Sequence, residues 1–250
     1  RQDTLLARLQ HARRLHQPPL MRAHVGPYLP DRAEAVRLFA DWSARLARTG
    51  HLDVLSIGTS QLTQSAFGED WSGRPNGGGV PINAPEEYAR IWEVSRPLLL
   101  RTYAGTRNIR ALAEMHECTH NIAWHALSLW WFCRIDGRGP NTVLQNLREH
   151  QSTLQYVAGT GKPFEPNVAH HFSFRGADDL SAIVSTVLAA RFVKRLGIRT
   201  LVLQVMLNTP KATWGVQDLA KARATLQLVR ELEADDFQVV LQPRAGLDYF

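Results

Sequence analysis

The sequence predicts an α/β protein built on parallel β-strands, and within that class a (β/α)8 barrel of the TIM type. Short runs rich in Val, Ile and Leu alternate with longer amphipathic segments, which is the pattern of βα units on a parallel sheet. The runs mostly follow one another at intervals of roughly 30 to 45 residues, as in a barrel. No glycine-rich dinucleotide-binding turn follows the first run, so a barrel is favoured over a doubly wound sheet.

The predicted strands are short apolar runs, each of which leads into a helical or polar stretch. Seven can be counted: Leu20–Val25, Leu52–Ile57, Pro97–Tyr103, His120–Ala126, Pro163–Phe172, Thr200–Leu207 and Phe237–Gln242. An eighth unit is missing, because the chain reaches its end soon after the seventh run, and an open sheet edge would remain. We therefore expect the barrel to continue beyond residue 250 or to be completed by another subunit.

Amphipathic segments between these runs predict the helices. They span Asp31–Arg48, Asn108–Glu117, Asn141–Val157, Asp178–Leu196 and Val216–Glu233. Asp31 can cap the start of its helix, and Gly50, Gly159 and Gly197 follow helix ends, where a left-handed residue is needed.

The first residues, Arg1–His16, are amphipathic and arginine-rich but lack the apolar stretch of a signal peptide. We expect a helical N-terminal extension over residues 1–17 and a barrel domain over residues 18–250.

The composition is that of an ordinary globular protein, with 44% hydrophobic and 21% charged residues. No run of about 18 apolar residues could span a membrane, so we expect no membrane partner. The two cysteines are too few for a disulfide scaffold, and a reducing, cytoplasmic location is expected. The net charge of +6 favours anionic ligands, but the arginines are spread along the chain and form no basic tract, which argues against nucleic acid.

The segment His116-Glu117-x-x-His120 has the spacing of a zinc hydrolase, in which two histidines one helical turn apart bind the metal and the glutamate is the general base. In the extended form of the motif, glycine and a third histidine would stand where Ala123 and Ala126 are. The competing interpretation ends the helix at Glu117 and starts the fourth strand at His120, so that the histidines do not share a helix. Zinc hydrolysis is kept as the alternative function, and no metal ligands are assigned.

One connection, Gly68–Pro85, is rich in glycine and proline and much longer than the usual loop between a strand and its helix. Loops of this kind lie at the carboxyl ends of barrel strands, where ligands bind. A binding loop is favoured over a disordered insertion.

Candidate site residues are the polar side chains at the carboxyl ends of the predicted strands, because barrel enzymes place their active sites there. His170 and His171 are candidate acid–base residues, although strand alternation would turn only one of them inward. His24 and His125 also end strands. The candidates for substrate binding are Thr59, Ser60, Gln61, Arg101, Thr106, Gln204, Asn208, Gln242 and Arg244.

Three stretches of the chain carry a family likeness. Residues 102–115 contain the pattern Gly-Thr-x-x-x-Arg-x-Leu-Ala-Glu, starting at Gly105, and residues 144–151 and 178–203 follow in the same order and spacing. Together they resemble the catalytic barrel subunit of glutamate mutase. The barrel of the lysine and ornithine aminomutases is similar over the same region, including Gly78-Gly-Val. The resemblance covers about Leu52 to Pro210.

This resemblance implies an adenosylcobalamin-dependent mutase, an isomerase that uses a radical. In the family the barrel presents its carboxyl-terminal mouth to the corrin, and Gly77, Gly78 and Gly105 would take part in cofactor binding. Tyr103 stands where glutamate mutase has a carboxylate-binding arginine, and Arg101, two residues earlier and on the same side of the strand, could replace it.

Other departures from the family bear on the expected substrate, cofactor and partner. Leu144 aligns with the glutamate that meets the substrate's amino group, so a substrate other than glutamate is expected. Gly58 and Gly105 stand at positions that bind pyridoxal phosphate in the aminomutases, which argues against that cofactor. The cobalamin-binding signature Asp-x-His-x-x-Gly is absent, so a downstream domain or a partner subunit would supply the corrin-ligating histidine, within an oligomer.

Overall fold

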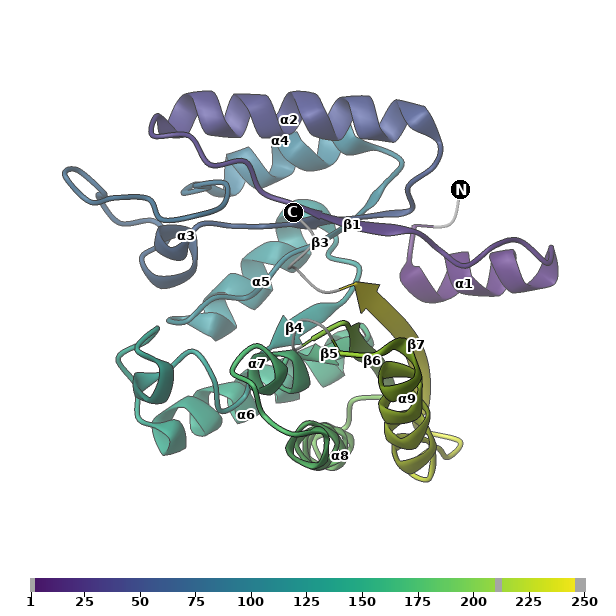
Figure 1. The fold of residues 1–250 in the computed structure, drawn as a ribbon. Helices are drawn as coiled ribbons and strands as arrows, with labels where there is room; N and C mark the ends of the chain where they lie inside the picture. The colour runs from purple at the N-terminus through teal and green to yellow at the C-terminus, as the bar shows by residue number, and fades with distance from the viewer. Residues whose placement is uncertain (1–2, 210–212, 246–250) are drawn as a thin grey trace. The chain divides into compact units, whose positions relative to one another are not determined.

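The computed structural model describes residues 3–209 and 213–245, and it shows an α/β fold with parallel strands (Figure 1). The chain divides into two compact units, Arg1–His125 and Ala126–Phe250. The predicted fold class, α/β with parallel sheets, is confirmed. A closed barrel of eight strands is not shown, because the described residues form seven strands in two sheets, one of three strands and one of four.

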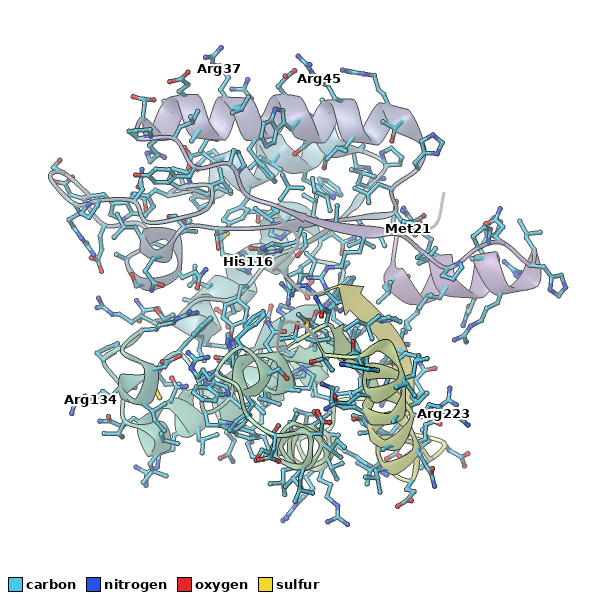
Figure 2. The ribbon with its side chains drawn as sticks, viewed as in Figure 1. Met21, Arg37, Arg45, His116, Arg134 and Arg223 are labelled. Carbon is cyan, nitrogen blue, oxygen red and sulfur yellow. The ribbon has the colours of Figure 1, made fainter. Side chains whose placement is uncertain are left out.

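The first unit contains a parallel sheet in the order β1 (Arg22–Val25), β2 (Val54–Ile57) and β3 (Leu99–Arg101). All the side chains of β2 are buried, as expected for a central strand. One face of the sheet packs on helices α2 (Arg32–Thr49) and α4 (Pro85–Ser95) through a continuous apolar core. The core includes Val36, Phe39, Leu55, Ile57, Tyr88, Ile91 and Leu100. Arg37 and Arg45 lie on the opposite, outward side of α2 (Figure 2).

Helix ends in this unit follow the predicted chemistry. The Asp31 carboxylate accepts a hydrogen bond from the Glu34 amide at 2.6 Å and caps α2, and Gly50 ends that helix with φ 70°. The N-terminal segment forms α1 (Leu5–Arg14). Arg8 of α1 donates to the carbonyls of Asp53 (3.0 Å) and Pro97 (2.8 Å), which precede β2 and β3. The helix is thereby fixed at the amino ends of these strands.

A short helix, α3 (Gln61–Ser65), lies between β2 and the glycine-rich connection Gly68–Pro85. The loop returns to the end of β2, where Val80 exchanges backbone hydrogen bonds with Gly58 (2.8 Å) and Ser60 (2.9 Å). Val80 and Ile82 are fully buried in the core. The loop is therefore part of the packed unit and not a disordered insertion.

The second unit contains a sheet in the order β4 (His125–Leu127), β5 (Phe164–Pro166), β6 (Thr200–Leu207) and β7 (Gln238–Ala245). Strands β6 and β7 are parallel over eight residue pairs, from Thr200 opposite Gln238 to Leu207 opposite Ala245. The helices of this unit are α6 (Val143–Thr160), α7 (Ala169–Ser173), α8 (Asp179–Arg195) and α9 (Gly215–Arg230), with a 3-10 turn at Arg134–Asp136.

Several local predictions were wrong. Helix α5 (Ile109–His120) includes His120, so the fourth strand starts later, at His125. The fifth strand ends at Pro166, and residues 169–173 form α7, because an apolar run does not by itself distinguish a buried strand from a short helix. Helix α6 continues through Gly159 and ends at Gly161, with φ 71°. The division predicted at residue 17 stays a prediction.

No helix within residues 3–209 and 213–245 is long and apolar enough to cross a membrane.

Candidate functional site

A row of polar side chains crosses the three-stranded sheet near the carboxyl ends of its strands. His24, Ser56 and Arg101 are direct neighbours in the strand register. The Ser56 hydroxyl lies 3.2 Å from Nδ1 of His24 and 3.5 Å from Nη1 of Arg101. Ser56 is completely buried and Arg101 is 3% exposed, whereas His24 is exposed. The predicted site residue Arg101 therefore extends along the sheet to a buried hydroxyl.

A second arginine reaches the same hydroxyl. Arg22 lies two residues before His24, on the same side of β1, and its Nη2 donates to Ser56 Oγ at 3.0 Å. Its guanidinium also lies over the ring of the buried Trp124, 5.5 Å from the ring centroid. Two guanidinium groups and an imidazole thus converge on one serine, and we call Arg22, His24, Ser56 and Arg101 the Ser56 cluster.

The polar residues that follow β2 shape the backbone there. Ser60 caps α3, because its hydroxyl accepts from the Thr63 amide at 3.2 Å. The Thr59 carbonyl accepts from Nε2 of Gln64 at 3.2 Å. Both Thr59 and Ser60 are buried, and Gln61 is exposed at the first position of the helix. These three predicted substrate-binding residues follow the strand that carries Ser56, and the hydroxyl of Ser60 has a structural role as the cap of α3.

The turn after β3 packs closely on α3. The amide of Thr106 donates to the Gln64 carbonyl at 2.8 Å. Gly105 has φ 111°, and a Cβ atom on it would lie 2.6 Å from the same carbonyl oxygen. Gly77 and Gly78 differ from Gly105, because they are exposed and a Cβ atom on Gly78 would meet no atom within 4 Å. Of the three glycines predicted to bind the cofactor, Gly105 is thus required by local packing.

The histidines of the zinc-like motif share helix α5 and are buried. The ring centroids of His116 and His120 lie 5.2 Å apart, and each ring lies 5.1 Å from that of Tyr88. The interpretation that separated them between a helix and a strand was wrong. Burial, together with neighbouring His120 and His125, lowers the pKa of His116 well below its usual value, and burial raises the pKa of Tyr88.

The rest of this motif is not arranged as in a zinc hydrolase. Glu117 Oε1 lies 2.7 Å from Nε2 of His125, so the carboxylate accepts a hydrogen bond from that imidazole. Neither ring nitrogen of His116 has a hydrogen-bond partner within the described residues. No group of three or more His, Cys, Asp or Glu side chains in residues 3–209 and 213–245 is placed to hold a metal ion.

In the second unit, His171 lies on α7 among aromatic rings and arginines. Its ring centroid lies 4.7 Å from that of Phe132 and 6.0 Å from that of Trp131. Burial, with the charges of Arg138, Arg175 and Arg244, lowers the pKa of His171 to about 3. The imidazole is therefore neutral at physiological pH. His170 is on the same helix, and its side chain lies outside what the structure describes.

The other predicted residues of this unit are spread over its strand ends. Gln204 and Gln242 are neighbours in the register of β6 and β7, as are Met206 and Arg244. Gln204 is 6% exposed, its Nε2 donates to Met206 Sδ at 3.3 Å, and its Oε1 has no partner in the described residues. The amide of Asn208 donates to Asp218 Oδ2 at 2.5 Å.

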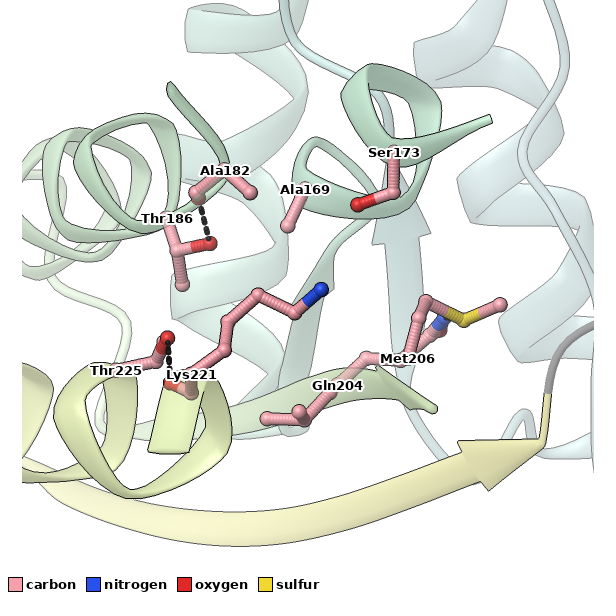
Figure 3. Close-up of a pocket in the computed structure, with 9 residues that line it drawn as sticks. Ala169, Ser173, Ala182, Thr186, Gln204, Met206, Lys221 and Thr225 are labelled. Carbon is pink, nitrogen blue, oxygen red and sulfur yellow. Dashed lines mark hydrogen bonds between the residues drawn. The ribbon is translucent and has the colours of Figure 1, made fainter. Parts of the chain in front are cut away.

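A buried lysine stands beside these strand ends. Lys221 of α9 extends toward α7 (Figure 3), and its Nζ lies 3.2 Å from the Thr209 carbonyl, 3.2 Å from Asp179 and 3.8 Å from Asp218. A cavity of about 20 Å³ is lined by Lys221, Gln204, Ser173 and Thr186, among others. That volume suits one water molecule and not a substrate.

Comparison with known proteins does not name a family. No protein-family model matches this chain, and no curated protein matches it.

Several residues of the site were missed by sequence reasoning. Arg22 and Ser56 were not selected, although Arg22 alternates with His24 along β1 and Ser56 interrupts an apolar strand. Period-two alternation would have pointed to Arg22, whereas nothing local indicates that both arginines meet at Ser56. Lys221 and Asp218 lie within an amphipathic helix, and their burial could not be read from its spacing.

Proposed function

We propose that this protein is an adenosylcobalamin-dependent radical mutase that acts on a small carboxylate or amino-acid-like substrate. The observation that carries the proposal is the Ser56 cluster, in which Arg22 and Arg101 both donate to one buried hydroxyl near the carboxyl ends of parallel strands. The family resemblance of residues 102–115, 144–151 and 178–203 supplies the reaction class.

The Ser56 cluster is suited to a carboxylate. Guanidinium groups bind carboxylates through paired, charge-assisted hydrogen bonds, and two of them held near each other repel unless an anion lies between. The burial of Arg101 keeps water away and strengthens its attraction for an anion. Ser56 holds both guanidinium groups in place, and His24 adds a third polar group at the exposed end of the row.

The proposal assigns cofactor binding in the first unit to two exposed glycines of the long loop. Gly77 and Gly78 leave the backbone of the long loop bare, and the open space at Gly78 permits close approach of a planar group. When bound, adenosylcobalamin supplies the carbon radical that starts the rearrangement. A partner domain or subunit with an Asp-x-His-x-x-Gly segment would ligate the cobalt.

The low pKa of His171 changes the role that we assign to this residue. A histidine with a pKa of about 3 is a weak general base, because a base is most effective with a pKa near the working pH. We propose that neutral His171 donates or accepts a hydrogen bond toward the substrate. Arg244, whose charge contributes to that low pKa, would bind an anionic part of it.

We also propose that the two parallel sheets belong to a (β/α)8-type barrel, which would enclose a radical and shield it from solvent. The support lies within the first unit. One face of its sheet carries the apolar core with α2 and α4, and the Ser56 cluster alternates with those core residues along each strand.

Carboxylate binding can be tested without the cofactor. Succinate, propionate and L-glutamate would be titrated into the full chain by calorimetry, and we expect one of them to bind. Arg101→Lys and Ser56→Ala should weaken that binding at least about tenfold, because the paired guanidinium contact or its support is lost. Ser43→Ala, at a buried serine of α2 whose hydroxyl donates to Phe39 O at 2.7 Å, is the matched control. Equal affinities in all variants would contradict the assignment.

The reaction class needs a separate experiment. The chain would be combined with a domain that carries Asp-x-His-x-x-Gly and with adenosylcobalamin tritiated at C5′, and transfer of tritium into each carboxylate would be measured. Transfer supports a radical mutase. Binding of a carboxylate without transfer, across a broad panel of carboxylates and amino acids, would overturn the mutase and leave the Ser56 cluster as a carboxylate site.

A further inference from the structure

Helix α8 carries large apolar side chains on its outer side and small ones on its inner side. Leu180, Val184 and Leu188 are 71%, 45% and 54% exposed, and we call these three residues the α8 surface. The buried side of the helix consists mainly of Ala182, Ser185, Thr186, Ala189, Ala190 and Val193. An amphipathic helix at a protein surface has the opposite arrangement, with its large apolar residues inside.

The three residues lie in one line. They are four positions apart, so they project from the same side of the helix and together extend for about 12 Å along its axis. Within the second unit, α8 contacts α7, α9 and β5 through its other side. Three large exposed apolar side chains in line on one helix are the kind of feature that a protein partner covers.

Charges of opposite sign lie at the two ends of the α8 surface. Asp178 caps the start of the helix, where its carboxylate accepts from the Ser181 amide at 2.8 Å, and it is exposed. Asp179 follows it. Arg191 and Arg195 are exposed in the last turns. The sequence of the surface is thus acidic, apolar and basic from start to end.

We propose that the α8 surface binds the same surface of a second copy of this chain, with the two helices antiparallel about a two-fold axis near Val184. In such a two-fold interface, each residue faces the residue that lies equally far from Val184 on the other side. Leu180 therefore meets Leu188 of the partner subunit. The basic end of each helix lies against the acidic start of the other. A parallel pairing would instead bring Arg191 and Arg195 of both copies together, which like charges disfavour.

The oligomeric state tests this pairing directly. Sedimentation velocity of the full chain should show a dimer at micromolar concentrations. Leu188→Glu should raise the dimer dissociation constant at least about thirtyfold, because it places a carboxylate against Leu180 of the partner subunit at both ends of the apolar contact. Arg191→Glu should also weaken the dimer. Leu219→Glu is the matched control, since Leu219 is 61% exposed on α9 and lies outside the α8 surface. Circular dichroism would show that each variant is folded.

A cross-link locates the contact. Val184→Cys in a Cys118→Ser background should give a covalent dimer with a short bismaleimide, whereas Leu144→Cys, at an exposed position of α6, should not. Three results would overturn the proposal: a wild-type monomer, a dimer unaffected by Leu188→Glu, or a dimer that forms no covalent product through Val184→Cys. A dimer that needs the cobalamin-binding partner would assign the surface to that partner.

Discussion

Glu117 of α5 and His125 of β4 are joined by a hydrogen bond of 2.7 Å between Oε1 and Nε2. A carboxylate can only accept, so Nε2 of His125 carries the proton. The imidazole is 1% exposed and the carboxylate 16%. This pair connects the end of a helix to the strand that follows it, which is a structural task for the glutamate that a zinc hydrolase would use as its base.

Replacement of Glu117 should therefore destabilise the fold. Glu117→Ala removes the acceptor of a buried imidazole, and we expect a loss of about 1 to 3 kcal/mol in the free energy of unfolding. Urea denaturation measures this. Glu93→Ala, at an exposed position of α4, should change it little. If both variants were as stable as the wild type, the hydrogen bond between Glu117 and His125 would contribute nothing to stability.

Stability should decrease as the pH falls from 6.5 toward 5. Burial lowers the pKa of His150 to about 4 and that of His171 to about 3, from 6.5, and also lowers that of His116. The unfolded chain therefore binds protons that the folded chain does not, and stability is complete only above the unfolded value. Each such histidine contributes a slope of up to about 1.4 kcal/mol per pH unit.

His150→Gln isolates one of these contributions. His150 Nδ1 lies 2.6 Å from the Asn146 carbonyl, and a glutamine amide can donate to the same oxygen without titrating. We expect a shallower dependence of unfolding free energy on pH between 6.5 and 5, measured by urea denaturation at each pH. The same substitution at the exposed His51 should leave the slope as it is in the wild type. An unchanged slope in His150→Gln would show that this imidazole binds protons equally in the folded and unfolded chain, against the lowered pKa.

Gly105 should tolerate no side chain. Gly105→Ala places a Cβ atom 2.6 Å from the Gln64 carbonyl oxygen and 2.7 Å from Leu112 Cδ1, at a φ of 111° that other residues rarely adopt. We expect a loss of at least about 2 kcal/mol. Gly137→Ala, at φ 70° with no atom within 4 Å of the new Cβ, should cost only about 1 kcal/mol. Thermal unfolding of the two variants compares them, and similar melting temperatures would refute the packing argument.

The buried Lys221 of α9 should stabilise the fold, because it neutralises acidic neighbours. Lys221→Met leaves Asp218, whose side chain is 7% exposed, without the cation that lies 3.8 Å away. Removal of one member of a buried ion pair costs about 3 to 5 kcal/mol. The double variant Lys221→Met with Asp218→Asn should recover part of this loss. Chemical denaturation of both would decide, and a double variant less stable than the single one would argue against the pair.

Much of the secondary structure could be predicted because it depends on neighbours in the sequence. Asp31 and Gly50 bound α2 through capping and a left-handed turn, which are local effects. Apolar runs gave β1, β2, β3 and β6 at close to their observed positions. The prediction of one strand over residues 163–172 was wrong, because a run of buried apolar residues is compatible with both a strand and a short helix.

The sequence by itself determined the α/β class, the order of the strands, and the positions of the longer helices α2, α5, α6, α8 and α9, but not α3, α4 or α7. Only the tertiary structure decided that Arg22 and Arg101 meet at Ser56. The same holds for the hydrogen bond from His125 to Glu117 and for the burial of Lys221 beside two carboxylates. The physical reason is that periodicity and capping act over one or two turns of chain. Strand register and burial are instead set by contacts between residues tens of positions apart, whose energies no local pattern encodes.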